Sequence, residues 1–186
     1  MVKNIARQNG SPVANIIGER VTLGSFRRDL IPLYYRWNND FATTRTLARS
    51  QPLAIDAMTA AYDAALDTDD CVDFTIYERA SARPIGSAYL HDIDEHNRTA
   101  EFGIVIGEAD TRGKGYGTET ARLMLDYAFS DLGLHSVLLR VYAFNHAGLH
   151  AYENAGFRVC GTRRQCHAMG GTLWDIVYME AVRGTT

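Results

Sequence analysis

The 186-residue sequence predicts a single α+β domain, in which one mixed and mostly antiparallel sheet carries helices on both faces. Three observations lead to this prediction. Short apolar segments with a period of two form a block in the middle of the chain, which is typical of strands joined by tight turns. Segments with a helical period lie on either side of that block. Strands and helices then alternate, which favours a layered domain.

The N-terminal part predicts one strand followed by two helices. The strand is the short apolar segment 21–23. Apolar residues at helical spacing follow it and indicate the first helix, which the polar segment 38–40 is expected to end. The second helix is expected to begin at Asp56, a residue type that caps helices, because apolar residues recur on one face from 58 to 66.

Three consecutive strands are predicted next. Apolar side chains occupy alternate positions at 72–76 and at 100–106. Between them, Arg83 and Pro84 begin a strand that is expected to run to about His91. Only the polar turn 92–98 separates the second strand from the third. Connections this short imply an antiparallel meander.

The last third changes period again. Apolar residues at helical spacing over 121–132 predict a long helix. The nearly continuous apolar segment 137–142 is typical of a strand covered on both faces, and a right-handed crossover makes it parallel to the strand before the helix. A short helix over 147–155 and a hairpin over 157–181 complete the order β-α-α-β-β-β-α-β-α-β-β.

Composition fits a globular protein, with 46% hydrophobic and 22% charged residues. Residues 1–16 are rich in Gly, Ser, Pro and Asn without a period, so we expect a flexible N-terminal arm before one domain over 17–186. The chain begins without a signal peptide or a spanning segment, and its three cysteines cannot form a closed disulfide set. A cytoplasmic location is therefore expected.

Charge is unevenly distributed along the chain. The net charge of −3 argues against nucleic acid or an anionic membrane as a partner. Between Asp56 and Asp110, however, 13 Asp and Glu residues stand against 3 Lys and Arg. This acidic middle indicates either attraction of a cationic substrate or an ordinary solvated face.

A glycine-rich segment before the long helix carries the clearest chemical signal. It consists of Arg112, Gly113, Lys114, Gly115, Tyr116, Gly117 and Thr118. Alternate glycines at a helix N-terminus leave backbone N–H groups exposed, and the helix dipole adds positive charge. The segment therefore predicts a site for a phosphate or pyrophosphate. It does not match the P-loop, because Glu108 stands where that motif needs its first glycine, and it does not match the dinucleotide fingerprint.

A second motif, N-x-x-G-x-x-x-Y-E-x-x-G-F, runs from Asn145 to Phe157. Together with the RxxGxG pattern of the glycine segment, it resembles the coenzyme A-binding motifs of the GNAT superfamily of N-acetyltransferases. The segments NRTAEFGIVIG, LDYAF, LGLH, WNND and RPIG look like the Rim-type branch, which acetylates ribosomal-protein N-termini, and like spermidine acetyltransferases. The resemblance covers about residues 17–180, and the predicted order of elements is that of the GNAT fold.

The resemblance implies direct acetyl transfer from acetyl-CoA to a primary amine in a ternary complex, without a metal. The acceptor is a protein N-terminus, a polyamine or a small molecule such as an antibiotic. A non-catalytic acyl-CoA sensor on the same fold is the alternative. A homodimer through the final hairpin is also expected.

The resemblance also assigns roles to residues. The backbone of 112–118 holds the pyrophosphate, and the pantetheine arm lies beside Ile104, Val105 and Ile106, where that strand splays from 137–142. A bulge in this strand frees the N–H of Val105 or Ile106 to polarise the thioester carbonyl. Tyr152 matches the general acid for the thiolate, although it is also typical of a core aromatic. Asn145 matches a cofactor-binding residue and equally a helix N-cap.

The acceptor amine arrives protonated and has to lose a proton before it attacks. Glu101 is the first candidate for the base, because strand alternation places it opposite Phe102 and Ile104. The other interpretation is a surface carboxylate paired with Arg98. His91 is the second candidate, and a water molecule is the third. Gly148 departs from the family pattern, in which Ser or Ala is common.

Overall fold

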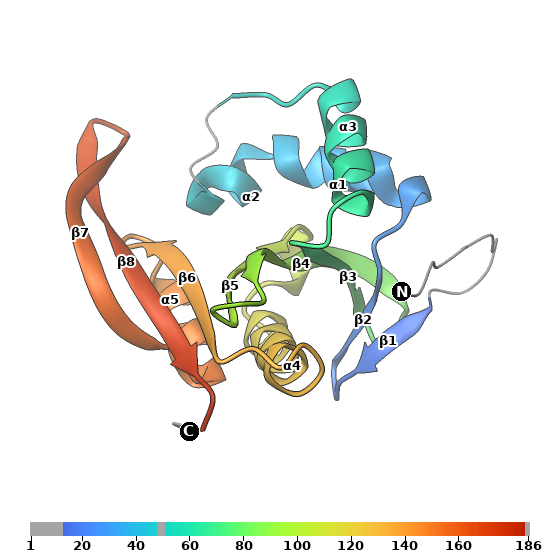
Figure 1. Ribbon diagram of the computed structural model, residues 1–186. Helices are drawn as coiled ribbons and strands as arrows, with labels where there is room; N and C mark the ends of the chain where they lie inside the picture. The colour runs from blue at the N-terminus through green and yellow to red at the C-terminus, as the bar shows by residue number, and fades with distance from the viewer. Residues whose placement is uncertain (1–12, 48–50, 185–186) are drawn as a thin grey trace.

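The computed structural model describes residues 13–47 and 51–184 (Figure 1). Its strands are β1 (Ala14–Ile17), β2 (Val21–Ser25), β3 (Val72–Glu78), β4 (Arg83–Asp94), β5 (Thr99–Ile106), β6 (Ser136–Tyr142), β7 (Arg158–Met169) and β8 (Thr172–Val182). Its helices are α1 (Ile31–Asn39), α2 (Phe41–Thr44), α3 (Ile55–Leu66), α4 (Tyr116–Ser130) and α5 (His146–Ala155). The α+β class and the predicted order are confirmed, with β1 and α2 added.

All strands of the described residues form one sheet in the order β1-β2-β3-β4-β5-β6-β8-β7. Every neighbouring pair is antiparallel except β5–β6, which is parallel as the crossover rule predicts. The β5–β6 ladder is short, running from Thr99 opposite Ser136 to Glu101 opposite Leu138. Beyond Glu101 the two strands diverge, and this divergence positions the candidate site.

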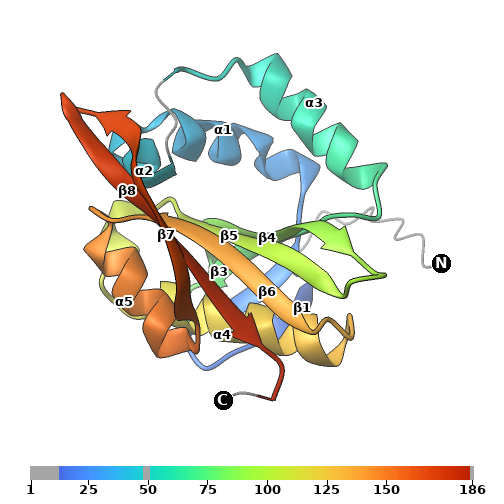
Figure 2. The same cartoon turned by 60° about the vertical axis from the view of Figure 1, so that its left-hand side comes forward.

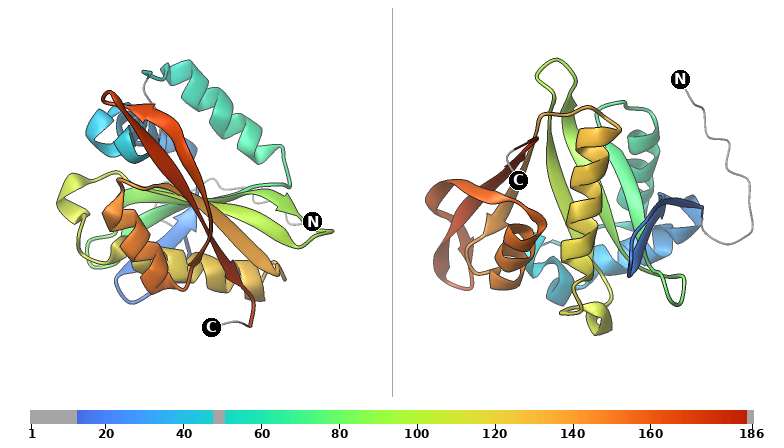
Figure 3. Two further views of the ribbon diagram at one scale, coloured as in Figure 1. Left: turned by 90° about the vertical axis from the view of Figure 1, so that its left-hand side faces the viewer. Right: turned by 90° about the horizontal axis from the view of Figure 1, so that it is seen from below.

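The helices form two layers around the sheet (Figure 2). Helices α1, α2 and α3 lie over one face, while α4 and α5 lie side by side on the other (Figure 3). The main core fills the space between the sheet and α4, with Met124, Leu139 and Met179 almost fully buried. A smaller core around Tyr34 and Trp37 fixes α1 and α3. None of the described helices is long and apolar enough to cross a bilayer.

Two elements at the N-terminal end were not expected. Strand β1 takes the last residues of the predicted arm, while residues 1–12 lie outside the described residues. Its side chains are mostly exposed, and the strand is held mainly by its ladder with β2. Because neither face is buried, the sequence shows no alternation of apolar and polar residues. Helix α2 begins directly after α1 because Asp40, predicted only to break a helix, accepts hydrogen bonds from the Ala42 N–H and the Thr43 hydroxyl.

Two further expectations were wrong in detail. Helix α3 begins at Ile55 after the N-cap Ala54, so Asp56 lies in the first turn and interacts with the helix dipole rather than capping. Strand β6 is covered on only one face, since buried and partly exposed residues alternate and Arg140 is exposed. The uncovered face of β6 lines a cavity.

Candidate functional site

Two cavities of about 630 Å³ each meet where β5 and β6 diverge. We call the first the loop cavity, because the segment 111–118 and α5 line it. We call the second the acidic cavity, because Asp73 and Glu101 line it on the α1–α3 side of the sheet. The residues that line both are Thr46, Leu47, Ile104, Val105, Asn145 and Tyr152. A molecule placed between the two strands can therefore contact both cavities.

The glycine segment forms an open end of the loop cavity. Gly113 and Gly115 have φ angles of +73° and +82°, a region that side chains rarely allow. Gly115 caps α4 without any side-chain hydrogen bond. Within the described residues, none of the N–H groups from Gly113 to Thr118 donates a recorded hydrogen bond. Unpaired donors at the positive end of a helix are the arrangement on which the predicted anion site depends.

Two side chains of this segment point away from the anion site. The Arg112 guanidinium donates to the Thr43 hydroxyl (2.7 Å), which ties α2 to the segment. The Tyr116 hydroxyl donates to Glu78 (2.8 Å). A cation comes instead from Arg20 in the β1–β2 turn, which donates to the Lys114 carbonyl (3.1 Å). No sequence signal links Arg20 to a segment that lies about ninety residues away, so sequence reasoning missed it.

Hydrogen bonding along β5 decides which of its N–H groups face the loop cavity. The Gly107 N–H donates to the Ile85 carbonyl on β4 (2.9 Å). In an antiparallel ladder the N–H groups that point to the same neighbouring strand recur at every second residue, so the Val105 N–H also points to β4. Ile104 and Ile106 direct their N–H groups to the side where β6 has diverged, and no described strand pairs with that side.

The expected bulge lies beyond β5 rather than at Val105 or Ile106. The β4–β5 register is unbroken through both residues. The N–H groups of Gly107 and Glu108 then both donate to Ile85 (2.9 and 3.2 Å), so two residues face one. Divergence of β6 is thus sufficient to free the Ile106 N–H, because a strand has donors on both of its edges.

Tyr152 projects from α5 to the junction of the two cavities. Its ring packs edge-on against Phe102 and at a steep angle to Phe157, with centroids 6.2 and 6.1 Å away. Burial raises the pKa of the Tyr152 phenol above its ordinary value. No described residue forms a recorded hydrogen bond with its hydroxyl. The ring thus packs in the core, as one of the two expectations holds, and the hydroxyl is left without a partner among the described residues.

Asn145 caps α5, because its Oδ1 atom accepts a hydrogen bond from the Gly148 N–H (3.0 Å). The same side chain lines both cavities. The glycine at position 148 leaves room for the Asn145 side chain in this cap. A Cβ at Gly148 would lie only 2.5 Å from the Asn145 Nδ2 atom.

The acidic cavity brings together titratable groups from four strands. Glu101, on β5, accepts a hydrogen bond from the Arg140 Nε atom on β6 (2.6 Å), so the expected pairing with Arg98 is wrong. Asp73 lies on β3, and its burial raises the pKa of its carboxyl, although Cys71 and His91 act in the opposite sense. Sequence reasoning missed Asp73, although a carboxylate within an apolar strand was a signal. Aromatic rings from Phe26, Tyr34, Tyr89 and Tyr142 line the remaining wall.

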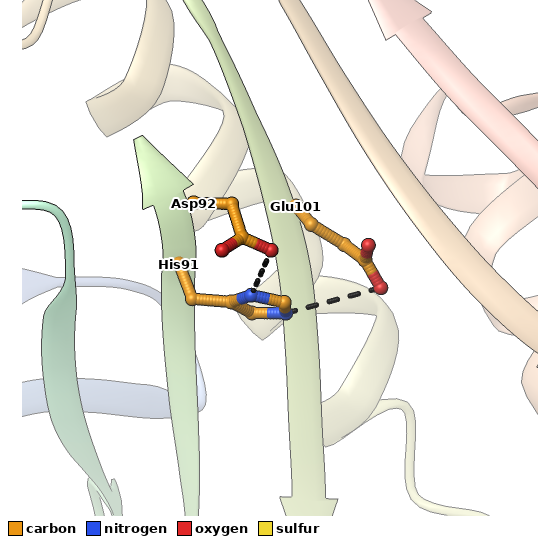
Figure 4. Close-up of side chains that lie close together, drawn as sticks. All are labelled: His91, Asp92 and Glu101. Atoms are coloured by element: carbon orange, nitrogen blue, oxygen red, sulfur yellow. Dashed lines mark hydrogen bonds and ion pairs between the residues drawn. The ribbon is translucent and has the colours of Figure 1, made fainter. Parts of the chain in front are cut away.

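His91, Asp92 and Glu101 form a cluster at the solvent end of this cavity (Figure 4). Their ligand atoms lie within 4.8 Å of one another, a spacing that could hold a metal ion. The donor set is a poor fit, however. The Arg140 N–H already occupies the Glu101 Oε1 atom, and a guanidinium repels a cation.

Comparison with known proteins places this geometry in a family. The profile described as "Acetyltransferase (GNAT) domain" matches residues 20–158, which is well over half of the chain. The chain belongs to the GNAT acetyltransferase family. The two motifs that carry the resemblance in the sequence are the glycine segment of the loop cavity and the α5 segment that bears Tyr152.

Named GNAT relatives are similar over different lengths. The Escherichia coli (strain K12) spermidine N(1)-acetyltransferase is 32% identical over 108 residues, 54% of this chain and 58% of that protein. The Drosophila melanogaster alpha/beta-tubulin-N-acetyltransferase 9 is 30% identical over 162 residues, 80% of each. This chain thus spans less than two thirds of the length of the E. coli relative.

Solved structures confirm the GNAT fold. The crystal structure of spermidine N-acetyltransferase from Vibrio cholerae, in complex with CoA and spermine, has a TM-score of 0.82 to this chain. It is 25% identical, and the comparison covers 88% of this chain and 96% of that one.

Proposed function

We propose that this GNAT protein transfers an acetyl group from acetyl-CoA to a primary amine of a cationic small molecule, with an alkyl polyamine as the favoured class. One observation carries the proposal. The divergence of β5 and β6 joins an anion-binding cavity to an acidic cavity, and the unpaired Tyr152 hydroxyl lies at their junction. An acyl carrier with a phosphorylated end and a cationic acceptor require these two environments.

The residues of the loop cavity fit acetyl-CoA, which supplies the activated thioester. The unpaired N–H groups of 113–118 bind the pyrophosphate, and Arg20, which is hydrogen-bonded to this segment, contributes positive charge. The N–H groups of Ile104 and Ile106 face the divergence, and one of them stabilises the developing oxyanion. Of the two donors expected from the sequence, Ile106 is therefore preferred over Val105. Asn145 holds the start of α5 beside both cavities.

Two side chains move protons. Glu101 receives the proton of the incoming ammonium group, because it faces the acidic cavity and only its Oε1 atom is engaged by Arg140. Tyr152 protonates the departing thiolate, because its hydroxyl lies at the junction of the two cavities and a phenol is protonated at neutral pH. The nucleophile therefore forms on one side of the divergence and the leaving group is neutralised on the other.

The acceptor class follows from the charge of the acidic cavity and from the relatives. Asp73 and Glu101 attract ammonium groups, and the aromatic walls accommodate the methylene chain between them. The E. coli and V. cholerae relatives are named spermidine N-acetyltransferases. The Drosophila melanogaster relative is named a tubulin N-acetyltransferase, so a protein amine is the competing acceptor.

The test measures thiol release from acetyl-CoA with spermidine, spermine, monoamines and N-terminal peptides, followed by the mass of each product. Faster turnover of polyamines than of equally long monoamines supports the proposal. Turnover of peptides alone would contradict the acceptor class. Tight binding of acetyl-CoA without product from any amine would contradict catalysis and indicate the acyl-CoA sensor.

Two expectations about the assembled protein belong to the same proposal. The edge strand β7 is largely exposed along its length, so the β7–β8 hairpin is the element through which two copies would pair. Light scattering of the purified chain tests this homodimer. A cytoplasmic location is tested by fractionation of the source cells.

A further inference from the structure

His91 and Glu101 form a cross-strand pair at the solvent end of the acidic cavity. They lie directly opposite each other on β4 and β5, so their side chains share one face of the sheet. The His91 Nε2 atom is 3.8 Å from the Glu101 Oε1 atom. The other ring nitrogen, Nδ1, is hydrogen-bonded to Asp92 at 2.9 Å (Figure 4). The ring therefore lies between two carboxylates and is hydrogen-bonded to that of Asp92.

The contact between His91 and Asp92 exists only because β4 is irregular at this point. Successive residues of a regular strand point to opposite faces, so neighbours cannot touch. Here the register shifts between His91 and Asp94, and Asp92 has a φ angle of +50°. A positive φ strains a residue other than glycine, and such positions cluster at functional sites. The bulge turns the Asp92 carboxylate back onto the ring.

The hydrogen bond to Asp92 selects the tautomer of the neutral His91 ring. An ionised carboxylate can only accept, so Nδ1 carries the proton and Nε2 keeps its lone pair toward Glu101. Exposure rises along the same line. The side chains of Glu101, His91 and Asp92 are 17%, 32% and 79% exposed. These three side chains thus lead from the cavity wall to bulk water.

We propose that His91 relays the acceptor proton from Glu101 to solvent, a role that rests on the proposed acetyl transfer. The ammonium group gives its proton to the Glu101 carboxylate and becomes the free amine. The Glu101 carboxyl then passes that proton to Nε2 once the two atoms, 3.8 Å apart in this structure, approach to hydrogen-bond distance. The transfer forms the imidazolium and restores the carboxylate. The imidazolium releases its Nδ1 proton to water at Asp92, and the tautomer with the proton on Nδ1 returns through water.

Other charged groups also face His91, and each affects this step. Asp73 on β3 and Asp92 on β4 place carboxylates near His91, whereas Arg140 on β6 places a guanidinium beside Glu101. The α1 and α3 residues that line the cavity carry no charge; these are Tyr34, Asn38, Met58 and Ala61. Among the residues that the structure describes, the charged groups around the relay therefore all belong to the sheet.

The test compares the pH profiles of amine acetylation by the wild-type chain, His91→Gln and His91→Ala. We expect kcat/KM for the amine to fall about tenfold in both variants at neutral pH, less than for loss of a direct base. Added imidazole should restore His91→Ala several-fold, and KM for acetyl-CoA should stay constant. His96→Gln, in the exposed β4–β5 turn, is the matched control and should behave as wild type.

Asp92→Gly separates a relay from a structural role. Glycine relieves the positive φ, so the thermal midpoint should hold or rise while kcat/KM falls several-fold. Equal pH profiles for wild type and His91→Gln, or no rescue by imidazole, would overturn the relay while leaving the acetyl transfer intact. Absence of turnover by the wild-type chain would overturn both.

Discussion

The Asn145 side chain occupies the space that a Cβ at position 148 would need. The two residues are joined by the hydrogen bond from the Gly148 N–H to Asn145 Oδ1 (3.0 Å), while an added Cβ would lie 2.5 Å from Nδ2 and 2.8 Å from Cγ. Real Cβ atoms do not approach that closely, so either the cap or the substituent has to give way. The glycine at 148, which departs from the family pattern, is thus linked to the orientation of a residue at the junction of both cavities.

The effect of a Gly148→Ala substitution on stability should therefore depend on the residue at position 145. Alone, it should gain about 1 kcal/mol of helix propensity but lose a cap of similar size, leaving little net change in stability. In an Asn145→Ala background the clash is absent, and the same substitution should stabilise by about 1 kcal/mol. Chemical denaturation of the wild type, the two single variants and the double variant measures this coupling. Identical effects in both backgrounds would contradict the steric link.

Tyr152→Phe should separate catalysis from binding. The Tyr152 hydroxyl forms no recorded hydrogen bond with the described residues and the ring packing is retained, so stability should be unchanged. Loss of the acid should lower kcat by about 10²-fold, with coenzyme A affinity unaltered. Steady-state kinetics and calorimetry test this, with Tyr127→Phe on α4 as the matched control. A drop in affinity at constant kcat would indicate a binding role instead.

Stability should decline in alkaline solution. Burial raises the pKa of the Tyr34 and Tyr152 phenols above their ordinary value of about 10. Above that pH the unfolded chain releases protons that the folded chain retains, so the free energy of unfolding falls as pH rises. Urea denaturation at several pH values from about 9 to 11 measures the slope. The slope should be smaller in Tyr152→Phe, and an equal slope would contradict the assignment to this phenol.

The glycine segment should tolerate no side chain at its left-handed positions. Gly113→Ala places a Cβ in open space, so only its φ of +73° opposes the change, at a cost of about 1–2 kcal/mol. Relaxation of that strain should misalign the unpaired N–H groups and weaken coenzyme A binding at least tenfold.

Gly133→Ala is the matched control for this prediction. Position 133 has a φ of +68°, is equally open and lies at the other end of α4. Its thermal midpoint should fall similarly, with coenzyme A binding retained. Equal losses of binding in both variants would attribute the effect to stability rather than to the anion site.

Local patterns were enough to predict most of the fold and the anion site. Alternating apolar residues predicted the meander, and helical spacing predicted α4 and α5, because packing on one face imposes a period. The glycines at 113, 115 and 117 predicted unpaired donors, because the missing hydrogen bonds of a helix N-terminus are a property of the backbone. The second motif brought Tyr152 and Asn145 into the same interpretation.

Other features required the folded chain, because they depend on contacts between distant segments. Only the ladder shows that β5 and β6 part after Glu101, which directs Ile106 rather than Val105 to the gap. Only packing gives Glu101 the partner Arg140 and directs Arg112 to Thr43. The bulge at Asp92 could not be predicted from the sequence either. In a regular strand His91 and Asp92 would point to opposite faces, and only the shift in register brings them together. Sequence by itself thus determined most of the elements that form and which chemistry their ends carry. Tertiary structure decided which side chains meet, because that depends on register and strand divergence, which the spacing of residues along the chain does not determine.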